Sequence, residues 1–332
     1  MHTPTETGTK IVGMGMCLPE KVLTNFDLEK IVETSDEWIR TRTGIQERRI
    51  IAKGQATSDL ASEASKQALK NAGLKASDID LIVVGTITPD MLFPSTACVV
   101  QRKIGAENAA CFDISAACSG FTYALSIADG LIRSGQYRKA LVIGAEALSP
   151  FLDWTERSTC VLFGDGAGAC ILVSTPQKEK GIIASYLGSD GTYADILGIP
   201  AGGSAIPPTH ESIDARLHTL KMEGSEVFKI AVRTMCDAVF EIAKRAGMKA
   251  TDIDCLIPHQ ANLRILQAVA ERVEIPLEKL FLNLQRYGNM SAASTAVAMY
   301  EAWEAKKFTP GSNTVLVAFG GGLTWASVWI KW

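Results

Sequence analysis

The sequence predicts an α/β protein built from two similar halves, and three observations carry this prediction. Segments with helical periodicity alternate along the chain with short apolar runs of the kind that form buried strands. A helix, turn and strand at residues 67–84 recur 174 residues later, at residues 241–257. Between the two copies, residues 174–181 are polar, charged and bounded by breakers, as a linker is. We therefore expect one half at residues 10–176 and a second half at residues 177–332.

Three blocks recur in the same order in the two halves, and repeats of this length outweigh chance similarity. The first block is an amphipathic helix closed by a glycine, Gly73 or Gly247, which leads through a capped turn into an apolar strand. These strands are expected at residues 81–84 and 255–257.

The second block is a strand, a turn of small residues and a helix, and it carries the chemistry. In the first half these are residues 109–114, 115–117 and 121 onward, and in the second half residues 280–283, 287–290 and 291–303. The third block is a glycine-rich turn before a strand, at residues 163–173 and 319–330. Because the equivalent turns of the second block hold Cys118 and Asn289, two packed halves would bring both residues to one central site.

The composition excludes several classes of protein. With 47% hydrophobic and 21% charged residues and a net charge of −3, the chain is not disordered, and its 332 residues suit one large or two medium units. Basic residues form only scattered short pairs, so no nucleic-acid surface is expected. The eight cysteines show no C-x-x-C spacing, which indicates a reducing, cytoplasmic location without structural zinc.

We expect neither residues 1–9 nor residues 308–330 to act as a targeting or membrane segment. Residues 1–9 are polar and lack the apolar stretch of a secretory signal, so we interpret them as a loose tail whose role the sequence does not show. Residues 308–330 are uncharged, but they contain Pro310, Asn313 and three consecutive glycines at 320–322. Two strands around a glycine turn fit this stretch better than a membrane span.

Cys118 is the candidate nucleophile. It stands between an apolar strand and the N-terminus of a helix expected to end near Gly135, where unpaired amides and the positive end of the helix dipole favour a thiolate. We therefore expect a lowered thiol pKa, which suits covalent catalysis. The alternative is a buried structural cysteine, because cysteine is among the most buried residue types.

Three further positions support a catalytic site. His259 directly follows the strand at residues 255–257, so it too is presented at a strand end. Asn289 alone would be read as a turn residue, and the glycines 320–322 as a tight turn. The backbone amides of these glycines could equally approach a developing oxyanion.

At these positions the chain closely resembles the β-ketoacyl-acyl-carrier-protein synthase III family, over residues 10–332. The resemblance rests on the motifs at residues 34–39, 41–45, 113–121, 258–265, 288–294 and 319–322. It implies the thiolase-like fold, in which two duplicated α/β halves form α-β-α-β-α layers and the chain forms a homodimer. The duplication found from the residues agrees with this implication.

The resemblance implies a decarboxylative condensation that initiates fatty acid synthesis. Cys118 would take the acyl group from a short acyl-CoA such as acetyl-CoA, with the amides of Cys118 and Gly321 as the oxyanion hole. His259 and Asn289 would then stabilise the enolate formed from malonyl-acyl-carrier-protein as carbon dioxide leaves. The product is a 3-oxoacyl thioester two carbons longer, and the reaction needs no metal or other cofactor.

The resemblance also assigns residues that bind the substrates and the partner. Trp38, Arg42, Arg157 and Asn262 would bind CoA, with Trp38 on the adenine, although a packed tryptophan with surface arginines is an equal alternative. Arg264 would meet the acidic acyl carrier protein at the tunnel mouth. Phe93 would limit the acyl pocket from the neighbouring subunit, or else be an ordinary core phenylalanine.

Several alternatives stay open. Within the same superfamily, a thiolase would have a second cysteine and an elongating condensing enzyme a second histidine in place of Asn289. A relative that transfers its acyl group to another nucleophile in specialised metabolism would keep the same triad of Cys118, His259 and Asn289. Outside the superfamily, the alternatives are a non-catalytic acyl- or CoA-binding protein and a Cys-His hydrolase. The acyl-chain preference and any feedback regulation are not readable from the residues, because pocket volume depends on many positions.

Overall fold

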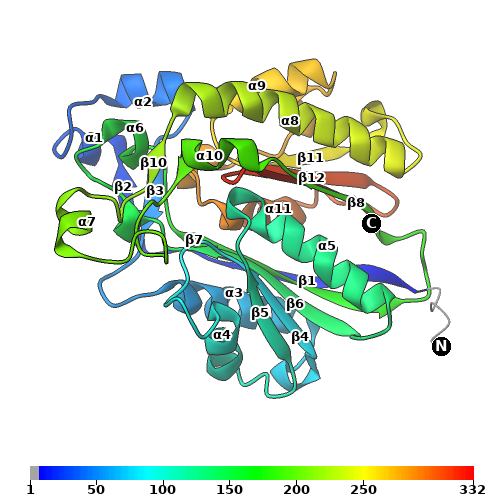
Figure 1. The fold of residues 1–332 in the computed structure, drawn as a ribbon. Coiled ribbons are helices and arrows are strands. Elements are labelled where there is room, and N and C mark those ends of the chain that lie inside the picture. Colours follow the sequence, from blue (N-terminus) through cyan, green and yellow to red (C-terminus); the bar gives the residue numbers. More distant parts are fainter. Residues whose placement is uncertain (1–6) are drawn as a thin grey trace.

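The computed structural model describes residues 7–332 and arranges them in five layers (Figure 1). Helices and sheets alternate from one face of the molecule to the other. The helices of the outer and middle layers are α8 (Gly224–Arg245) and α9 (Leu263–Arg272), then α5 (Gly120–Arg133) and α11 (Ala292–Glu304), then α3 (Thr57–Ala72) and α4 (Thr96–Ile104). The expected α-β-α-β-α order is confirmed.

Two sheets separate these helical layers. The first has the order β1-β7-β6-β4-β5, with β1 (Gly8–Cys17), β7 (Gly166–Thr175), β6 (Lys139–Glu146), β4 (Leu81–Gly85) and β5 (Ala110–Ile114). The second has the order β8-β13-β12-β11, with β8 (Gly181–Ser189), β13 (Thr324–Lys331), β12 (Asn313–Gly320) and β11 (Cys255–Pro258). The turn between β7 and β8 joins the two sheets, and the division of the chain at residues 176 and 177 stays a prediction.

The two sheets repeat the same order and the same strand directions. The pairs β1–β7 and β8–β13 are antiparallel, as are β7–β6 and β13–β12, whereas β6–β4 and β12–β11 are parallel. The turns that follow equivalent strands therefore reach equivalent edges of the two sheets. This symmetry is the structural form of the repeat in the sequence.

The strand expected at residues 280–283 is reduced to one parallel bridge, between Leu256 and Leu280. The Gln260 side chain satisfies two backbone groups that a neighbouring strand would otherwise pair. Its amide nitrogen donates to the Phe281 carbonyl at 3.2 Å, and its oxygen accepts from Asn283 N at 3.0 Å. The segment before the short helix α10 (Leu284–Tyr287) is thus held by this one bridge to β11 and by the Gln260 side chain, without a continuous strand pairing.

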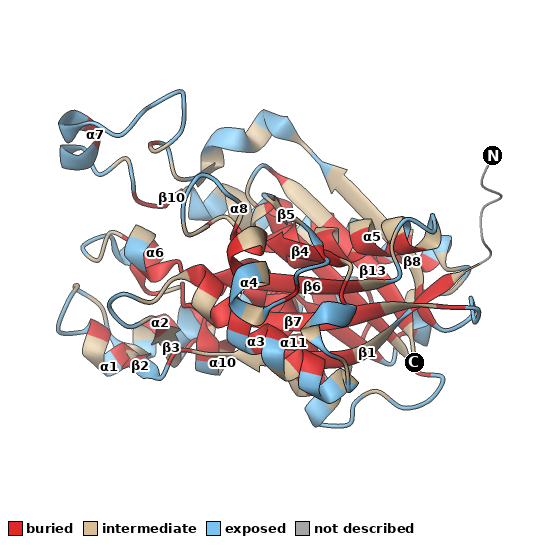
Figure 2. Ribbon diagram, turned by 90° about the horizontal axis from the view of Figure 1, so that it is seen from below, coloured by how far each residue is buried: buried red, intermediate tan, exposed pale blue. Residues whose placement is uncertain are grey.

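The middle helices are enclosed by both sheets, and their sequences show why. Most of α11 is buried on every side and consists of small and apolar residues, whereas α8 alternates buried and exposed positions and covers one face of the second sheet. Figure 2 shows buried residues concentrated in the central strands, while helix α7 (His210–Asp214) projects as an exposed segment. The apolar core thus has three parts: one lies between the two sheets around α5 and α11, and the others lie between each sheet and the outer helices that cover it.

Both ends of the chain differ in part from expectation. Gly8 and Thr9, placed in the loose tail, belong to β1, and the Thr9 hydroxyl donates to Asp129, so burial against α5 orders these two residues. Residues 1–6 of that predicted tail lie outside the described residues. Residues 313–331 form the predicted pair of strands, β12 and β13. Across residues 7–332, no helix combines the length and the apolar character needed to cross a membrane.

Short elements surround the end of the sheets at which the candidate residues lie. They are α1 (Asn25–Leu28), α2 (Asp36–Thr43), α6 (Arg157–Cys160), β2 (Lys21–Thr24), β3 (Glu47–Ile50), β9 (Leu197–Gly198) and β10 (Lys221–Met222). The strands β2 and β3 pair with each other, as do β9 and β10.

Candidate active site

Cys118 lies at a sharp turn between a strand and a helix. Strand β5 ends at Ile114, a single 3-10 turn spans Ala117–Ser119, and α5 begins at Gly120. Ala117 has φ +46°, a left-handed conformation that a residue with a side chain adopts only under constraint from its surroundings. This turn holds the Cys118 thiol, which is 6% exposed, on a wall shared by two cavities.

The expectation of a lowered Cys118 pKa is wrong for the free protein. Burial raises the pKa of the Cys118 thiol to about 12, and the nearby Glu146 carboxylate adds to this rise, while a hydrogen bond with the Ser291 side chain acts in the opposite direction. The position at a helix N-terminus therefore did not predict the thiol pKa correctly, because loss of hydration is the largest effect at this enclosed position. Cys118 is a neutral thiol at rest.

His259 follows β11 and lines the first cavity together with Cys118 and Asn289. Its backbone N–H donates to the Val317 carbonyl at 2.8 Å, which fixes the residue against β12. Burial lowers the pKa of His259 to about 3, so the imidazole is neutral. Because Nδ1 is enclosed without a partner, Nε2 is the nitrogen available to a ligand in the cavity.

Asn289 is held by its backbone and by one side-chain atom. Its N–H donates to the Leu162 carbonyl at 2.8 Å, and its carbonyl accepts from Gly164 N at 3.0 Å. The side-chain oxygen accepts from Ser291 N at 2.8 Å, which leaves the amide nitrogen as the donor that Asn289 can offer to the cavity. His259 and Asn289 thus supply two neutral donors beside one thiol.

Two cavities meet at Cys118. The first, about 100 Å³, is lined by His259 and Asn289 and by apolar side chains that include Phe228 and Met235. The second, about 310 Å³, continues on the other side of Cys118 and is lined by Ile87, Leu148, Leu220, Gly321 and Ser291, among others. A chain attached to the Cys118 sulfur would thus find an apolar space to one side and polar donors to the other.

Gly320, the last residue of β12, packs directly against the nucleophile turn. A Cβ atom at Gly320 would lie 2.5 Å from the Cys118 backbone nitrogen, a distance that excludes any side chain. Gly321 lines the second cavity next to Cys118. The backbone N–H groups of Gly321 and Cys118 are therefore candidate donors for an oxyanion hole in this cavity.

Trp38 lies at a surface hollow near one end of the first cavity. The Arg157 guanidinium lies 4.6 Å from the Trp38 ring centre, and that of Arg42 lies 5.1 Å from it. Both arginines are exposed and Trp38 is half-buried, and Trp38 lines two surface hollows, one with Arg157 and one with Arg42. The structure thus brings these three residues together.

Asn262 connects this hollow to the first cavity. It lines the cavity beside His259, and its amide nitrogen donates to the Arg42 carbonyl at 3.1 Å. Its oxygen accepts from Arg264 N at 2.9 Å and caps helix α9, so its first role is structural. The exposed Arg264 guanidinium lies 5.7 Å from the Phe228 ring, above the first cavity.

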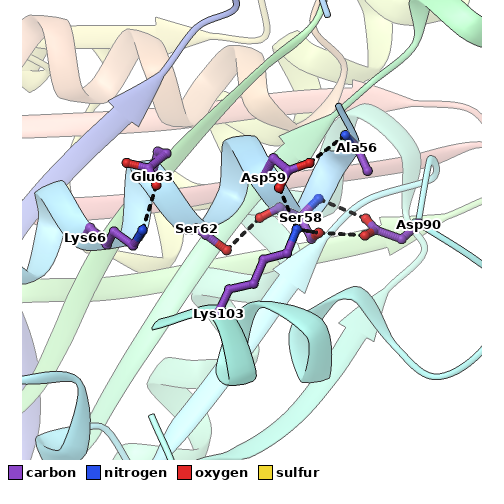
Figure 3. A network of polar contacts seen from close by, with 8 residues as sticks. All are labelled: Ala56, Ser58, Asp59, Ser62, Glu63, Lys66, Asp90 and Lys103. Atoms are coloured by element: carbon purple, nitrogen blue, oxygen red, sulfur yellow. Dashed lines mark hydrogen bonds and ion pairs between the residues drawn. The ribbon is translucent and has the colours of Figure 1, made fainter. Parts of the chain in front are cut away.

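Phe93 does not line the pocket of its own chain. Its side chain is 84% exposed, as is that of Leu92, so the alternative of an ordinary core phenylalanine is wrong. Asp90 anchors the base of this segment by accepting from Ser58 N at 2.9 Å and Ser58 Oγ at 2.6 Å, and Lys103 of α4 donates to the same hydroxyl (Figure 3). The apolar tip is thus held out from the surface by an ordered base.

Two residues at the nucleophile were missed in the sequence. Glu146 is fully buried at the end of β6, and its carboxylate accepts from the Ser291 hydroxyl at 3.1 Å. A carboxylate after the apolar run 140–145 was a visible signal, because a buried charge needs a reason. Nothing in the pattern indicated that it would face Cys118 through Ser291.

Comparison with known proteins agrees with this site. Residues 112–191 match the family described as 3-oxoacyl-[acyl-carrier-protein (ACP)] synthase III, and residues 243–332 match its C-terminal part. A beta-ketoacyl-[acyl-carrier-protein] synthase III from Caldanaerobacter subterraneus subsp. tengcongensis is 57% identical over 322 residues, which cover 97% of both chains.

Solved structures extend the comparison. The crystal structure of 3-oxoacyl-[acyl-carrier-protein] synthase III from Aquifex aeolicus VF5 is 47% identical and superposes with a TM-score of 0.91, covering 98% of this chain and 100% of that chain. The priming beta-ketosynthase from the R1128 polyketide biosynthetic pathway is 32% identical with a TM-score of 0.92, covering 100% and 98%.

Proposed function

The chain belongs to the 3-oxoacyl-[acyl-carrier-protein] synthase III family, and from this premise we propose that it condenses an acyl-CoA primer with malonyl-acyl-carrier-protein. The primer is acetyl-CoA or another short acyl-CoA, and the reaction initiates fatty acid synthesis. One observation carries the proposal: Cys118, His259 and Asn289 come from three separate elements and line one cavity.

In the first half-reaction, the Cys118 sulfur attacks the thioester carbon of the primer. The carbonyl oxygen becomes an oxyanion held by the N–H groups of Cys118 and Gly321, and CoA leaves as the acyl-cysteine forms. The close packing of Gly320 on Cys118 supports this assignment, because it holds both amides rigidly at one wall. The second cavity takes the acyl chain.

In the second half-reaction, malonyl-acyl-carrier-protein enters the first cavity. Its thioester oxygen accepts hydrogen bonds from His259 Nε2 and the Asn289 amide nitrogen. As the bond to the carboxylate breaks and carbon dioxide leaves, its electron pair forms an enolate that these donors stabilise. The enolate carbon attacks the acyl-cysteine carbonyl, and the Cys118 thiolate leaves. The electron pair comes from decarboxylation, so the proposal requires no metal or redox cofactor.

CoA binds at the surface hollow and reaches Cys118 through the first cavity. Trp38 stacks on the adenine, and the Arg42 and Arg157 cations, already 5.1 and 4.6 Å from its ring, contact the base and phosphates. Asn262 links the hollow to the cavity, which supports its place in the CoA site. Arg264, exposed above the cavity, meets the acidic acyl carrier protein.

The active form is a homodimer in the cytoplasm. Strand β5 is an edge of the first sheet, its side chains are largely half-exposed, and the neighbouring apolar segment at Phe93 stands away from its own chain. A second copy would cover both features, and Phe93 would then limit the partner's acyl pocket. All eight cysteines are free, as suits a reducing compartment.

A same-fold acyltransferase of specialised metabolism is the second candidate, since a priming polyketide synthase shares the fold at 32% identity. The 57% identity to a synthase III over nearly the whole chain favours the condensation of acyl-CoA with malonyl-acyl-carrier-protein. The test is to incubate the protein with acetyl-CoA and malonyl-acyl-carrier-protein and to identify the carrier-bound product by mass spectrometry. Formation of 3-oxobutyryl carrier with release of CoA supports condensation, whereas acetyl transfer without loss of carbon dioxide supports the alternative.

A further inference from the structure

Acylation of Cys118 requires a group that takes the thiol proton, and the triad lacks one. Burial raises the pKa of the Cys118 thiol to about 12, so the proton is still present when the primer binds. Burial also lowers the pKa of His259 to about 3, so this imidazole is too weak a base to take the thiol proton readily. A different acceptor must therefore lie within reach of the sulfur.

Ser291 connects the thiol to the buried carboxylate of Glu146. The Ser291 side chain lies beside the Cys118 thiol and lowers its pKa, and the Ser291 hydroxyl donates to Glu146 Oε1 at 3.1 Å. Both Ser291 and Cys118 line the second cavity. The backbone of Ser291 has φ +46° and ψ −124°, a strained conformation for a residue with a side chain.

The surroundings of Glu146 fit an acceptor rather than an ion pair. Its other hydrogen bonds come from Thr88 Oγ1 at 2.5 Å, Thr86 Oγ1 at 3.3 Å and Ile87 N at 3.2 Å, and no Lys or Arg is among its partners. A buried carboxylate without a counter-charge is costly, and burial raises the pKa of Glu146 to about 7. Such a group can take and return a proton near neutral pH.

The other charged groups on elements packed against Glu146 are held elsewhere. Asp165, next to β7, accepts from Ile51 N at 2.8 Å and from Ser149. Asp90, after β4, binds Ser58, and Glu301 at the far end of α11 binds Arg286. The Cys118 thiol is a titratable group whose pKa responds to the Glu146 carboxylate.

We propose that Ser291 and Glu146 form a proton relay for the acylation of Cys118, an inference that rests on the proposed function. As the sulfur–carbon bond to the acyl group forms, the Sγ proton passes to Ser291 Oγ and the Ser291 hydroxyl proton passes to Glu146 Oε1. When the bond to CoA breaks, the same path in reverse returns a proton to the leaving sulfur, and Glu146 is ionised again. Ser291 touches the reacting sulfur, and Glu146 is a positioning residue that acts through it.

The test separates acylation from the other steps. Glu146→Gln and Ser291→Ala should each slow acyl-Cys118 formation from acetyl-CoA in a single turnover, by about ten- to a hundredfold, the lower range for loss of general-base catalysis. Decarboxylation of malonyl-acyl-carrier-protein should stay within about twofold, because it uses His259 and Asn289. Ser291→Ala keeps the backbone N–H that orients Asn289, so that site is preserved.

Alkylation of Cys118 by iodoacetamide at fixed pH supplies a readout that does not need acyl-CoA. Iodide leaves without a proton, so thiolate formation alone sets this rate. Glu146→Gln removes a charge that raises the thiol pKa and should speed alkylation while slowing acylation, whereas Ser291→Ala should slow both. Asp165→Asn, a change at an equally buried carboxylate bound to a serine, is the matched control and should alter neither rate.

The outcomes are distinct. Opposite effects of Glu146→Gln on alkylation and acylation support the relay, and faster or unchanged acylation in this variant overturns it. If Glu146→Gln does not fold, Ser291→Ala decides alone, and acylation at the wild-type rate overturns the relay. If the wild-type protein takes no acyl group from any acyl-CoA, the proposed function fails. In that case the alkylation rates still test the relay: if both variants alkylate at the wild-type rate, neither Glu146 nor Ser291 acts on the thiol.

Discussion

Gly320 lies so close to Cys118 that a Cβ atom at position 320 would be 2.5 Å from the Cys118 backbone nitrogen. The contact joins the last residue of β12 in the second half to the nucleophile turn of the first half. It explains why a glycine is required there: the constraint is close backbone approach rather than a left-handed conformation. The geometry of the nucleophile thus depends on a residue about 200 positions away in the chain.

Gly320→Ala should therefore impair catalysis strongly. The new methyl group must displace the Cys118 amide, and a misplacement of about 1 Å can cost about a hundredfold in rate. Acyl-enzyme formation measured by mass spectrometry checks this. Gly130→Ala is the matched control, because nothing lies near a Cβ there on helix α5. It should keep full activity and gain up to about 1 kcal/mol in stability. An active Gly320→Ala would show that the turn tolerates a shift.

The Trp38 hollow should control primer binding rather than chemistry. Trp38→Ala and Arg157→Ala remove the aromatic face and the cation 4.6 Å from it, so KM for acyl-CoA should rise by about tenfold for a loss of about 1.4 kcal/mol. The kcat value should change little. Arg138→Ala, at an exposed arginine that binds Asp80 through its backbone, is the control. A fall in kcat with unchanged KM would place this surface outside the CoA site.

Much of the fold was predictable because the two halves of the sequence repeat the same order of helices and strands. Repeated blocks around Gly73 and Gly247 predicted two sheets, and the structure gives both sheets one strand order. The segment at Leu280 was overpredicted, because a side chain, Gln260, replaces the ladder and leaves no trace in local periodicity. Local propensity is informative about an element, whereas tertiary contacts decide whether it pairs.

The candidate triad of Cys118, His259 and Asn289 was predictable because Cys118 and His259 follow strands and Asn289 occupies the turn of the second half that is equivalent to the Cys118 turn. The protonation states were not. Cys118 and His259 sit at enclosed positions, and burial, which no motif encodes, sets both pKa values. Glu146 was missed for the same reason, since its position opposite Ser291 arises from packing of β6 against α11.

His259 should show no titration in the working range. Burial lowers its pKa to about 3, so the neutral ring is the active donor and the rate of malonyl decarboxylation should not fall as the pH drops through 6.5. The unfolded chain binds a proton below 6.5 that the folded protein excludes, so stability is lost as the pH falls from 6.5 towards 3. His259→Gln should remove this pH dependence of stability. An acid limb in decarboxylation near 6.5 that disappears in His259→Gln would contradict the neutral assignment.

Glu146 should destabilise the folded protein as the pH rises. Its pKa is raised from 4.5 to about 7, so the folded state binds more protons between these values and stability falls as the pH rises through this window. The difference in unfolding free energy between Glu146→Gln and wild type should shift in favour of the variant, by on the order of 3 kcal/mol, between pH 4.5 and 8. Denaturant unfolding at several pH values measures it, with exposed Glu107→Gln as control. A flat difference would mean that Glu146 ionises normally.

Phe93 should affect primer length without affecting the fold of its own chain. Its side chain is 84% exposed, so Phe93→Ala should change unfolding of the monomer by no more than about 0.5 kcal/mol. In the proposed dimer the same change enlarges the partner's acyl pocket, and the rate with longer primers should rise relative to acetyl-CoA. Phe26→Ala, at another exposed phenylalanine, is the control. An unchanged primer profile in a confirmed dimer would remove Phe93 from the pocket.

The most direct test of the central claim is the intact mass of the protein after incubation with a panel of acyl-CoAs, before and after malonyl-acyl-carrier-protein is added. The account predicts one added acyl group with short primers, none in Cys118→Ala, and loss of that group as a 3-oxoacyl carrier two carbons longer appears. Absence of the acyl mass, or an acyl-enzyme that malonyl-acyl-carrier-protein does not discharge, would contradict it.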